Sequence, residues 1–193
     1  MKNIGILGGT FDPPHYGHLL IAQEAYHQLS LDEVWFMPSN VPPHKEKESD
    51  STAGDRLEMT RCAISGNDAF KLNDVELRRT GPSYTIDTIR LITDKEKDAV
   101  FYFIIGSDMV EYLPKWKNID DLLRYVTFAG VKRPGYSLET EYPIAEVEVR
   151  EFDVSSSFLR ERIATGGNVR YYLPDEVRLY IEENGLYAKR EST

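Results

Sequence analysis

The sequence predicts an α/β fold with a mostly parallel sheet, and three observations carry this prediction. Short apolar segments alternate with longer segments whose apolar residues recur at helical spacing. Residues 100–105 form a continuous apolar run, which is typical of a strand buried on both faces. Glycines follow directly after the first apolar segment and after this run. In open sheets of this kind, ligands bind beyond the carboxyl ends of the strands.

The expected strands are short and bounded by turn residues. They span residues 2–7, 34–37, 70–72, 100–105, 126–131 and 147–152. Glycines end the first and the fourth, and proline ends the second. Residues 147–152 alternate apolar and polar positions, as a half-buried or edge strand does.

The expected helices carry apolar residues three and four positions apart. They span residues 16–29, 55–65, 85–92, 156–164 and 175–184. Gly166 and Gly185 follow the last two helices, where glycine is the usual C-terminal signal. The polar stretch 40–54 is long for a connection, which favours a binding loop.

Composition excludes several classes of protein. The 193 residues carry a formal net charge of −9, which argues against a nucleic-acid partner because phosphate neutralisation needs a cationic surface. The 41% hydrophobic content allows a core, and the length fits a single domain, 1–193, with a C-terminal helical part at about 155–187. No apolar run approaches the ~20 residues of a membrane span. We expect a cytoplasmic protein without an internal disulfide, because Cys62 is the only cysteine.

The strongest chemical signal is the segment 8–18, Gly-Gly-Thr-Phe-Asp-Pro-Pro-His-Tyr-Gly-His, between the first strand and the first helix. Gly8 and Gly9 allow backbone N–H groups to approach a ligand closely. The helix that follows offers unpaired N–H groups and the positive end of its dipole. His15 and His18 project to one side of its first turn, where both can donate to phosphate oxygens. A metal site is the weaker interpretation, because zinc needs more ligands than two histidines.

A second signal is Ser155-Ser156-Ser157-Phe-Leu-Arg160 at the start of a late helix. Serines at this position are most often simple caps. Arg160 lies one turn after Ser157 on the same face, so hydroxyls, N–H groups and a guanidinium converge. Residues 154–173 hold three arginines and one glutamate, so the stretch is locally basic. The combination predicts a polyphosphate site.

Together the two motifs resemble the nucleotidyltransferase superfamily of Rossmann-like α/β proteins, and within it the bacterial nicotinate-nucleotide adenylyltransferases. The resemblance runs from about residue 4 to residue 187. It includes segments 38–45, 82–85, 106–108, 115–116 and 172–174. Ser157 stands where relatives commonly carry threonine, which also supplies a hydroxyl. The resemblance implies a Rossmann-like open sheet with helices on both faces.

The resemblance also implies a reaction: ATP and nicotinate mononucleotide give nicotinate adenine dinucleotide and pyrophosphate, with Mg²⁺. It makes three residues catalytic, as ligands of the ATP phosphates: His15, His18 and Arg160. Further ATP-binding residues would be Gly8, Gly9, Thr10, Phe11, Gly106, Asp108, Arg133, Ser155, Ser156 and Ser157. Residues that bind the mononucleotide would be Asn40, His44, Lys45, Tyr84, Thr85, Tyr112 and Trp116.

The attacking group in such a reaction is a phosphate oxygen that is anionic at neutral pH, so no general base is required. Catalysis then consists of alignment and charge neutralisation, with the histidines as hydrogen-bond donors. Mg²⁺ can be held mainly by phosphates and water, without a protein metal site.

Simpler interpretations stand beside these roles. Trp116 is equally explained by ordinary packing. Lys45 lies in a charged loop where most lysines are merely solvated, and Asp108 after a strand is often a helix cap. Rival functions are the same chemistry on nicotinamide mononucleotide or phosphopantetheine, and a non-catalytic nucleotide-sensing module. The sequence leaves the oligomeric state open, a homo-oligomer included.

Overall fold

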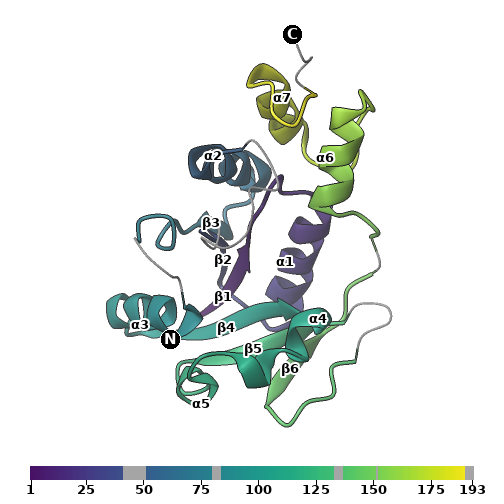
Figure 1. Ribbon diagram of the computed structural model, residues 1–193. Coiled ribbons are helices and arrows are strands. Elements are labelled where there is room, and N and C mark those ends of the chain that lie inside the picture. Colours follow the sequence, from purple (N-terminus) through teal and green to yellow (C-terminus); the bar gives the residue numbers. More distant parts are fainter. Residues whose placement is uncertain (41–50, 80–83, 133–136, 151, 190–193) are drawn as a thin grey trace.

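The computed structural model describes residues 1–40, 51–79, 84–132, 137–150 and 152–189. Its strands form one six-stranded sheet in the order β3-β2-β1-β4-β5-β6, and every neighbouring pair is parallel (Figure 1). The strands are β1 Lys2–Gly9, β2 Glu33–Pro38, β3 Phe70–Leu72, β4 Ala99–Gly106, β5 Val126–Val131 and β6 Ile144–Val147. The predicted α/β class with a parallel sheet is confirmed.

The direction of strand addition reverses between β1 and β4. Gly9 pairs with Pro38 of β2 on one side of β1, and Leu7 pairs with Ile104 of β4 on the other. The segments that follow β1 and β4 therefore leave the same edge of the sheet next to each other. This switch point is where open parallel sheets bind their ligands.

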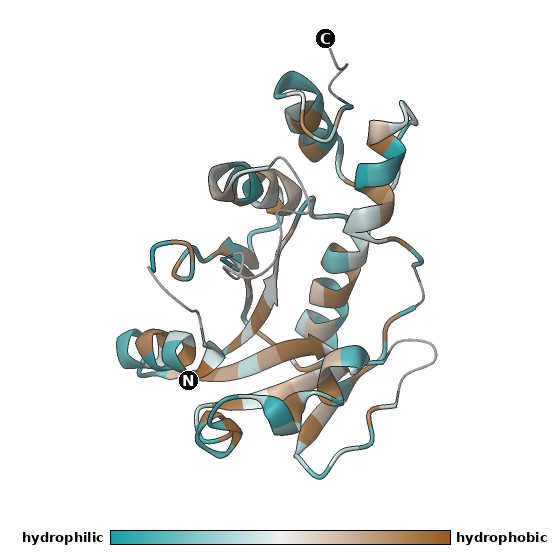
Figure 2. Ribbon diagram, in the orientation of Figure 1, coloured by the Kyte–Doolittle hydropathy of each residue, from teal (hydrophilic) through white to brown (hydrophobic). Residues whose placement is uncertain are grey.

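Helices cover both faces of the sheet (Figure 1). They are α1 Tyr16–Gln28, α2 Ala53–Ile64, α3 Thr85–Lys95, α4 Ser107–Val110, α5 Ile119–Leu122, α6 Ser156–Ala164 and α7 Asp175–Glu183, with a 3₁₀ turn η1 at Leu113–Lys115. Alternate residues of β4 face opposite ways: Ile104 joins the core beneath α1, α2, α6 and α7, whereas Phe103 joins the core beneath α3, α4 and α5. In Figure 2, brown hydrophobic residues run along the strands, whereas the helices carry brown and teal residues side by side.

The final predicted strand was wrong in its position. Pairing with β5 runs from Ile144 to Val147, and the backbone of Glu148 then binds the side chain of Gln28 in α1. The Gln28 amide donates to the Glu148 carbonyl at 2.7 Å and accepts from its N–H at 2.9 Å. The alternation predicted a strand that continues past Val147, but sheet pairing ends there and the backbone of Glu148 is bound by α1.

The sequence also missed three short elements between β4 and β5, namely α4, η1 and α5. Each has three or four residues. A helix of one turn is too short to show an apolar period. Among the described helices, none is long and apolar enough to cross a membrane.

Candidate active site

The turn between β1 and α1, residues 10–15, is the centre of the site; it is called the β1–α1 turn below. His15 is the N-cap of α1, and the rings of His15 and His18 stack with centroids 3.8 Å apart. The N–H of His15 donates to Nδ1 of His18 at 3.2 Å. With Nδ1 acting as an acceptor, neutral His18 carries its proton on Nε2 and can donate from there.

Gly17 makes this arrangement of histidines sterically feasible. A Cβ at position 17 would lie 2.9 Å from Nδ1 of His15 and 3.2 Å from a methyl of Val154. Any side chain there would push the His15 ring or the start of α6 aside. The His-x-Gly-His spacing therefore needs its glycine for packing as well as for access to the backbone.

Three backbone carbonyls of the β1–α1 turn are bound by the protein. Arg56 of α2 donates to the Thr10 carbonyl at 2.8 Å. Arg160 of α6 donates to the Asp12 carbonyl at 2.9 Å, and the Ser156 hydroxyl donates to the Pro13 carbonyl at 2.8 Å. A carbonyl oxygen that faces a phosphate would repel it. Because protein donors bind these three carbonyl oxygens, their partial negative charge is neutralised within the protein.

The three serines of α6 have separate roles. Ser155 caps the helix, because its hydroxyl accepts from the N–H of Phe158 at 3.2 Å. Ser156 binds the β1–α1 turn, and Ser157 accepts from the Arg160 guanidinium at 3.3 Å. The capping interpretation therefore holds for Ser155, while Ser156 and Ser157 connect α6 to the site.

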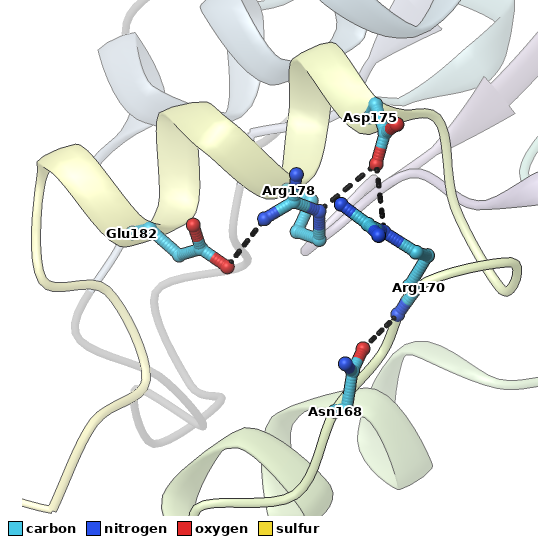
Figure 3. Close-up of polar contacts among 5 residues, drawn as sticks. All are labelled: Asn168, Arg170, Asp175, Arg178 and Glu182. Atoms are coloured by element: carbon cyan, nitrogen blue, oxygen red, sulfur yellow. Dashed lines mark hydrogen bonds and ion pairs between the residues drawn. The ribbon is translucent and has the colours of Figure 1, made fainter.

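The locally basic stretch after Ser155 contributes less charge to the turn than its composition indicates. Arg162 donates to the Asn168 carbonyl at 2.6 Å. Arg170 lies 3.8 Å from Asp175, whose other partner is Arg178 at 2.9 Å (Figure 3). These two arginines therefore have partners within the C-terminal part, whereas Arg160 contacts the turn.

The end of β4 lies beside the β1–α1 turn at the switch point. Gly106 is the N-cap of α4, with Asp108 in the first turn and Ser107 fully buried. Asp108 is thus the second residue of the helix and is not its cap. Pairing of β4 with β1 runs to Ile104, so the end of β4 at Gly106 and the start of α4, which holds Asp108, follow beside the end of β1.

A second group consists of Tyr84, Tyr112 and Trp116, called the aromatic group below. Tyr84 is the N-cap of α3, which begins at Thr85, and Nζ of Lys117 lies 3.8 Å above its ring. Lys115 lies 5.2 Å from the Tyr112 ring.

Trp116 is partly buried and makes edge contacts with two sheet residues. Its ring centroid is 5.9 Å from that of Phe103 and 5.7 Å from that of Phe128. The prediction that Trp116 packs against the protein is therefore confirmed by its contacts with Phe103 and Phe128.

The remaining predicted residues of the mononucleotide side are Asn40, His44 and Lys45. The Asn40 amide donates to the Arg79 carbonyl at 3.4 Å. His44 and Lys45, like the ATP-side candidate Arg133, lie outside the described residues. Within the described ranges, no three His, Cys, Asp or Glu side chains come together as a metal site.

Comparison with known proteins agrees with this architecture. Residues 6–162 match the cytidylyltransferase-like family. The chain belongs to the cytidylyltransferase-like family. It is 56% identical to a probable nicotinate-nucleotide adenylyltransferase of Geobacillus thermodenitrificans, over 100% of this chain and 89% of the relative. It is 59% identical to the protein of the same name from Bacillus cytotoxicus, over 97% and 99% of the two chains.

Solved structures share the fold of this cytidylyltransferase-like chain. The nicotinic acid mononucleotide adenylyltransferase of Plasmodium falciparum, complexed with NaAD, superposes with a TM-score of 0.81. The match covers 97% of this chain and 98% of that one at 20% identity. A putative nicotinate-nucleotide adenylyltransferase from Vibrio parahaemolyticus gives a TM-score of 0.72 at 19% identity, over 98% of both chains.

In this cytidylyltransferase-like protein, sequence reasoning missed the buried residues that bind the β1–α1 turn from the interior of the fold. Arg56 is 2% exposed; besides Thr10 it binds the Ser39 carbonyl at 2.7 Å, and burial lowers its pKa while Asp12 counteracts this. A signal for Arg56 existed, because Met59, Thr60 and Ala63 follow at helical spacing and form a buried face. No local pattern could reveal Tyr187, which binds Asp12 from 175 positions away.

Proposed function

We propose that this chain transfers AMP from ATP to nicotinate mononucleotide, producing nicotinate adenine dinucleotide and pyrophosphate. The observation that carries the proposal is the convergence of His15, His18 and Arg160 on one turn whose carbonyl groups are held by the protein. The identity of 56–59% to relatives named as nicotinate-nucleotide adenylyltransferases supports the choice of reaction.

The geometry supports hydrogen-bond donation and not proton abstraction by the histidines. Nδ1 of His18 accepts a backbone N–H, so Nε2 is the nitrogen that carries a hydrogen to donate to a phosphate oxygen. The α1 dipole and the Arg160 guanidinium add positive potential at the same place. Charge that develops on the α-phosphoryl group and on the leaving pyrophosphate would be stabilised by these fixed donors.

The nucleophile in this proposal is a phosphate oxygen of the mononucleotide. It needs alignment with the α-phosphorus, and no protein group has to remove a proton from it. In this proposal Trp116 stacks on the pyridine ring, and N–H groups at the start of α3, at Thr85, bind its carboxylate. Lys117 above Tyr84 adds a positive charge that favours a carboxylate over an amide.

Mg²⁺ is part of the proposal as a companion of ATP. In this proposal the cation is bound chiefly through phosphates and water, because Mg²⁺ commonly keeps several waters in phosphate-transfer sites. When bound, the cation would neutralise phosphate charge. Gly106, Asp108 and Ser157 complete the proposed ATP side, whereas the Phe11 side chain is 1% exposed and supports His18 from within the core. Cytoplasmic location and a homo-oligomer stay predictions of the sequence.

A substrate panel tests the function. Pyrophosphate release from ATP and Mg²⁺ is measured with nicotinate mononucleotide, nicotinamide mononucleotide or phosphopantetheine, and with no acceptor. We expect the highest kcat/KM with nicotinate mononucleotide. A preference for either of the other two acceptors would contradict the proposed substrate and leave the proposed adenylyl transfer in place. ATP binding without release in any arm would favour a nucleotide sensor and contradict the proposal.

A further inference from the structure

The carboxylate of Asp12 points into the protein and is held there by two hydroxyl groups. Oδ1 accepts from the Ser51 hydroxyl at 2.6 Å and from the Tyr187 hydroxyl at 2.6 Å. All three residues are at most 7% exposed. Hydrogen bonds to an ionised acceptor at this separation are about twice as strong as neutral ones.

The two hydroxyls come from segments that are far apart in the chain. Ser51 precedes α2, and Tyr187 follows α7, so the contact joins the β1–α1 turn to both segments. The Tyr187 hydroxyl also lies 3.7 Å from the sulfur of Met59 in α2. Burial and the neighbouring Asp12 raise the pKa of Tyr187, which keeps its phenol protonated and able to donate.

The turn needs such support because its backbone is strained beside Asp12. Phe11 has φ of 51° and is 1% exposed, and Tyr187 has φ of 63°. Residues other than glycine in this region cost on the order of 1–3 kcal/mol and persist where their surroundings hold them. The Phe11 ring lies edge-on to His18, with centroids 5.0 Å apart. A change at residues 11 and 12 would therefore reach His18 through Phe11, and Arg160 through the Asp12 carbonyl.

We propose that Tyr187 and Ser51 are positioning residues: by holding the Asp12 carboxylate they fix the β1–α1 turn in the shape that aligns His18 and Arg160 with the phosphates of ATP. This inference rests on the proposed adenylyl transfer. Neither hydroxyl touches the reacting atoms in this scheme. Their effect passes through the backbone of residues 11 and 12, and misplacement of about 1 Å at a reacting centre can lower a rate about 10²-fold.

A matched pair of tyrosines separates positioning from plain stability. Tyr187→Phe removes the hydroxyl from Asp12. Tyr180→Phe removes a comparable hydroxyl, which donates to Asp55 at 2.9 Å and also connects the C-terminal part to α2, but away from the turn. Ser51→Ala removes the second donor, and Ser51→Thr restores a hydroxyl at the same position.

Each variant is measured by Tm and by steady-state kinetics well below its Tm, with ATP and nicotinate mononucleotide. We expect Tyr187→Phe and Ser51→Ala to lower kcat about tenfold, with KM for the mononucleotide within about twofold of the parent. Tyr180→Phe and Ser51→Thr should keep the parental kcat. A kcat for Tyr187→Phe equal to that of Tyr180→Phe overturns the proposal.

Two further outcomes are also decisive. If Tyr187→Phe does not fold, the kcat of Ser51→Ala is compared with that of Ser51→Thr, and equal values overturn the proposal. If the parent chain releases no pyrophosphate, the proposed function fails separately, and the positioning role is tested by calorimetry with ATP. We then expect Kd to rise about tenfold in Tyr187→Phe and to stay unchanged in Tyr180→Phe; equal Kd values in the two variants would overturn it.

Discussion

The β1–α1 turn is enclosed by contacts from four other segments, whereas two members of the aromatic group are about half exposed. Arg56, Arg160 and Ser156 bind backbone carbonyls of the turn, and Ser51 and Tyr187 hold its only carboxylate. In contrast, Tyr84 is 43% exposed and Tyr112 is 53% exposed.

This difference matches the chemistry that each side would perform. Charge that develops in a transition state is stabilised best by donors that do not have to reorganise, and buried supports supply that rigidity. Recognition of a flat ring and a carboxylate needs contacts that form when the ligand arrives. We therefore expect changes at the β1–α1 turn to lower kcat and changes at the aromatic group to raise KM.

The largest effect is expected for His18→Ala. Loss of a preorganised donor lowers kcat by about 10²- to 10³-fold, and KM for the mononucleotide should change little because the contact strengthens in the transition state. His27→Ala, at the other end of α1, is the matched control. Equal losses in kcat and in mononucleotide binding would show that His18 serves ground-state binding. They would contradict the expectation that changes at the β1–α1 turn act mainly on kcat.

The next effect is expected for Arg160→Lys. A lysine keeps the charge but cannot bind the Asp12 carbonyl and Ser157 with one planar fork, so kcat should fall about 10- to 100-fold. Arg162→Lys is the control on the same helix, since Arg162 binds the Asn168 carbonyl. Steady-state kinetics of both variants check this, and an equal loss in the control would contradict the separation of the two arginines.

Trp116→Ala tests the aromatic group. Removal of a stacking surface worth about 1–3 kcal/mol should raise KM for the mononucleotide about tenfold and leave kcat within about threefold. Trp116→Phe, which keeps a ring against Phe103 and Phe128, should have a smaller effect. Tm is measured alongside, because these ring contacts also stabilise the fold. A loss in kcat with KM unchanged would assign Trp116 to catalysis.

The smallest effect is expected for Lys117→Ala. An ion pair at an exposed site contributes about 0.2–1 kcal/mol, so loss of the charge facing the carboxylate should raise KM for nicotinate mononucleotide by at most about fivefold. KM for nicotinamide mononucleotide should not change, since the amide carries no charge. Lys115→Ala is the control from the same segment. Equal changes in KM for both mononucleotides would show that Lys117 does not interact with the carboxylate.

Most of the secondary structure could be predicted from local sequence. Strands β3 and β5 and helix α6 have the predicted bounds, and Gly166 and Gly185 adopt positive φ values of 76° and 61° at the ends of the last two helices. These features depend on neighbouring residues: apolar period, capping and the freedom of glycine. The His-x-Gly-His and Ser-Ser-Ser-x-x-Arg motifs were visible for the same reason.

Contacts between distant segments could not be predicted in this way. The sequence by itself determined the parallel α/β class, the turn after β1 and the cap of α6, because these follow from residues a few positions apart. Only the tertiary structure decided where β6 ends, which arginine reaches the turn, and that Tyr187 holds Asp12. Each of these depends on a hydrogen bond between groups that are distant in the chain, and folding alone brings such groups together.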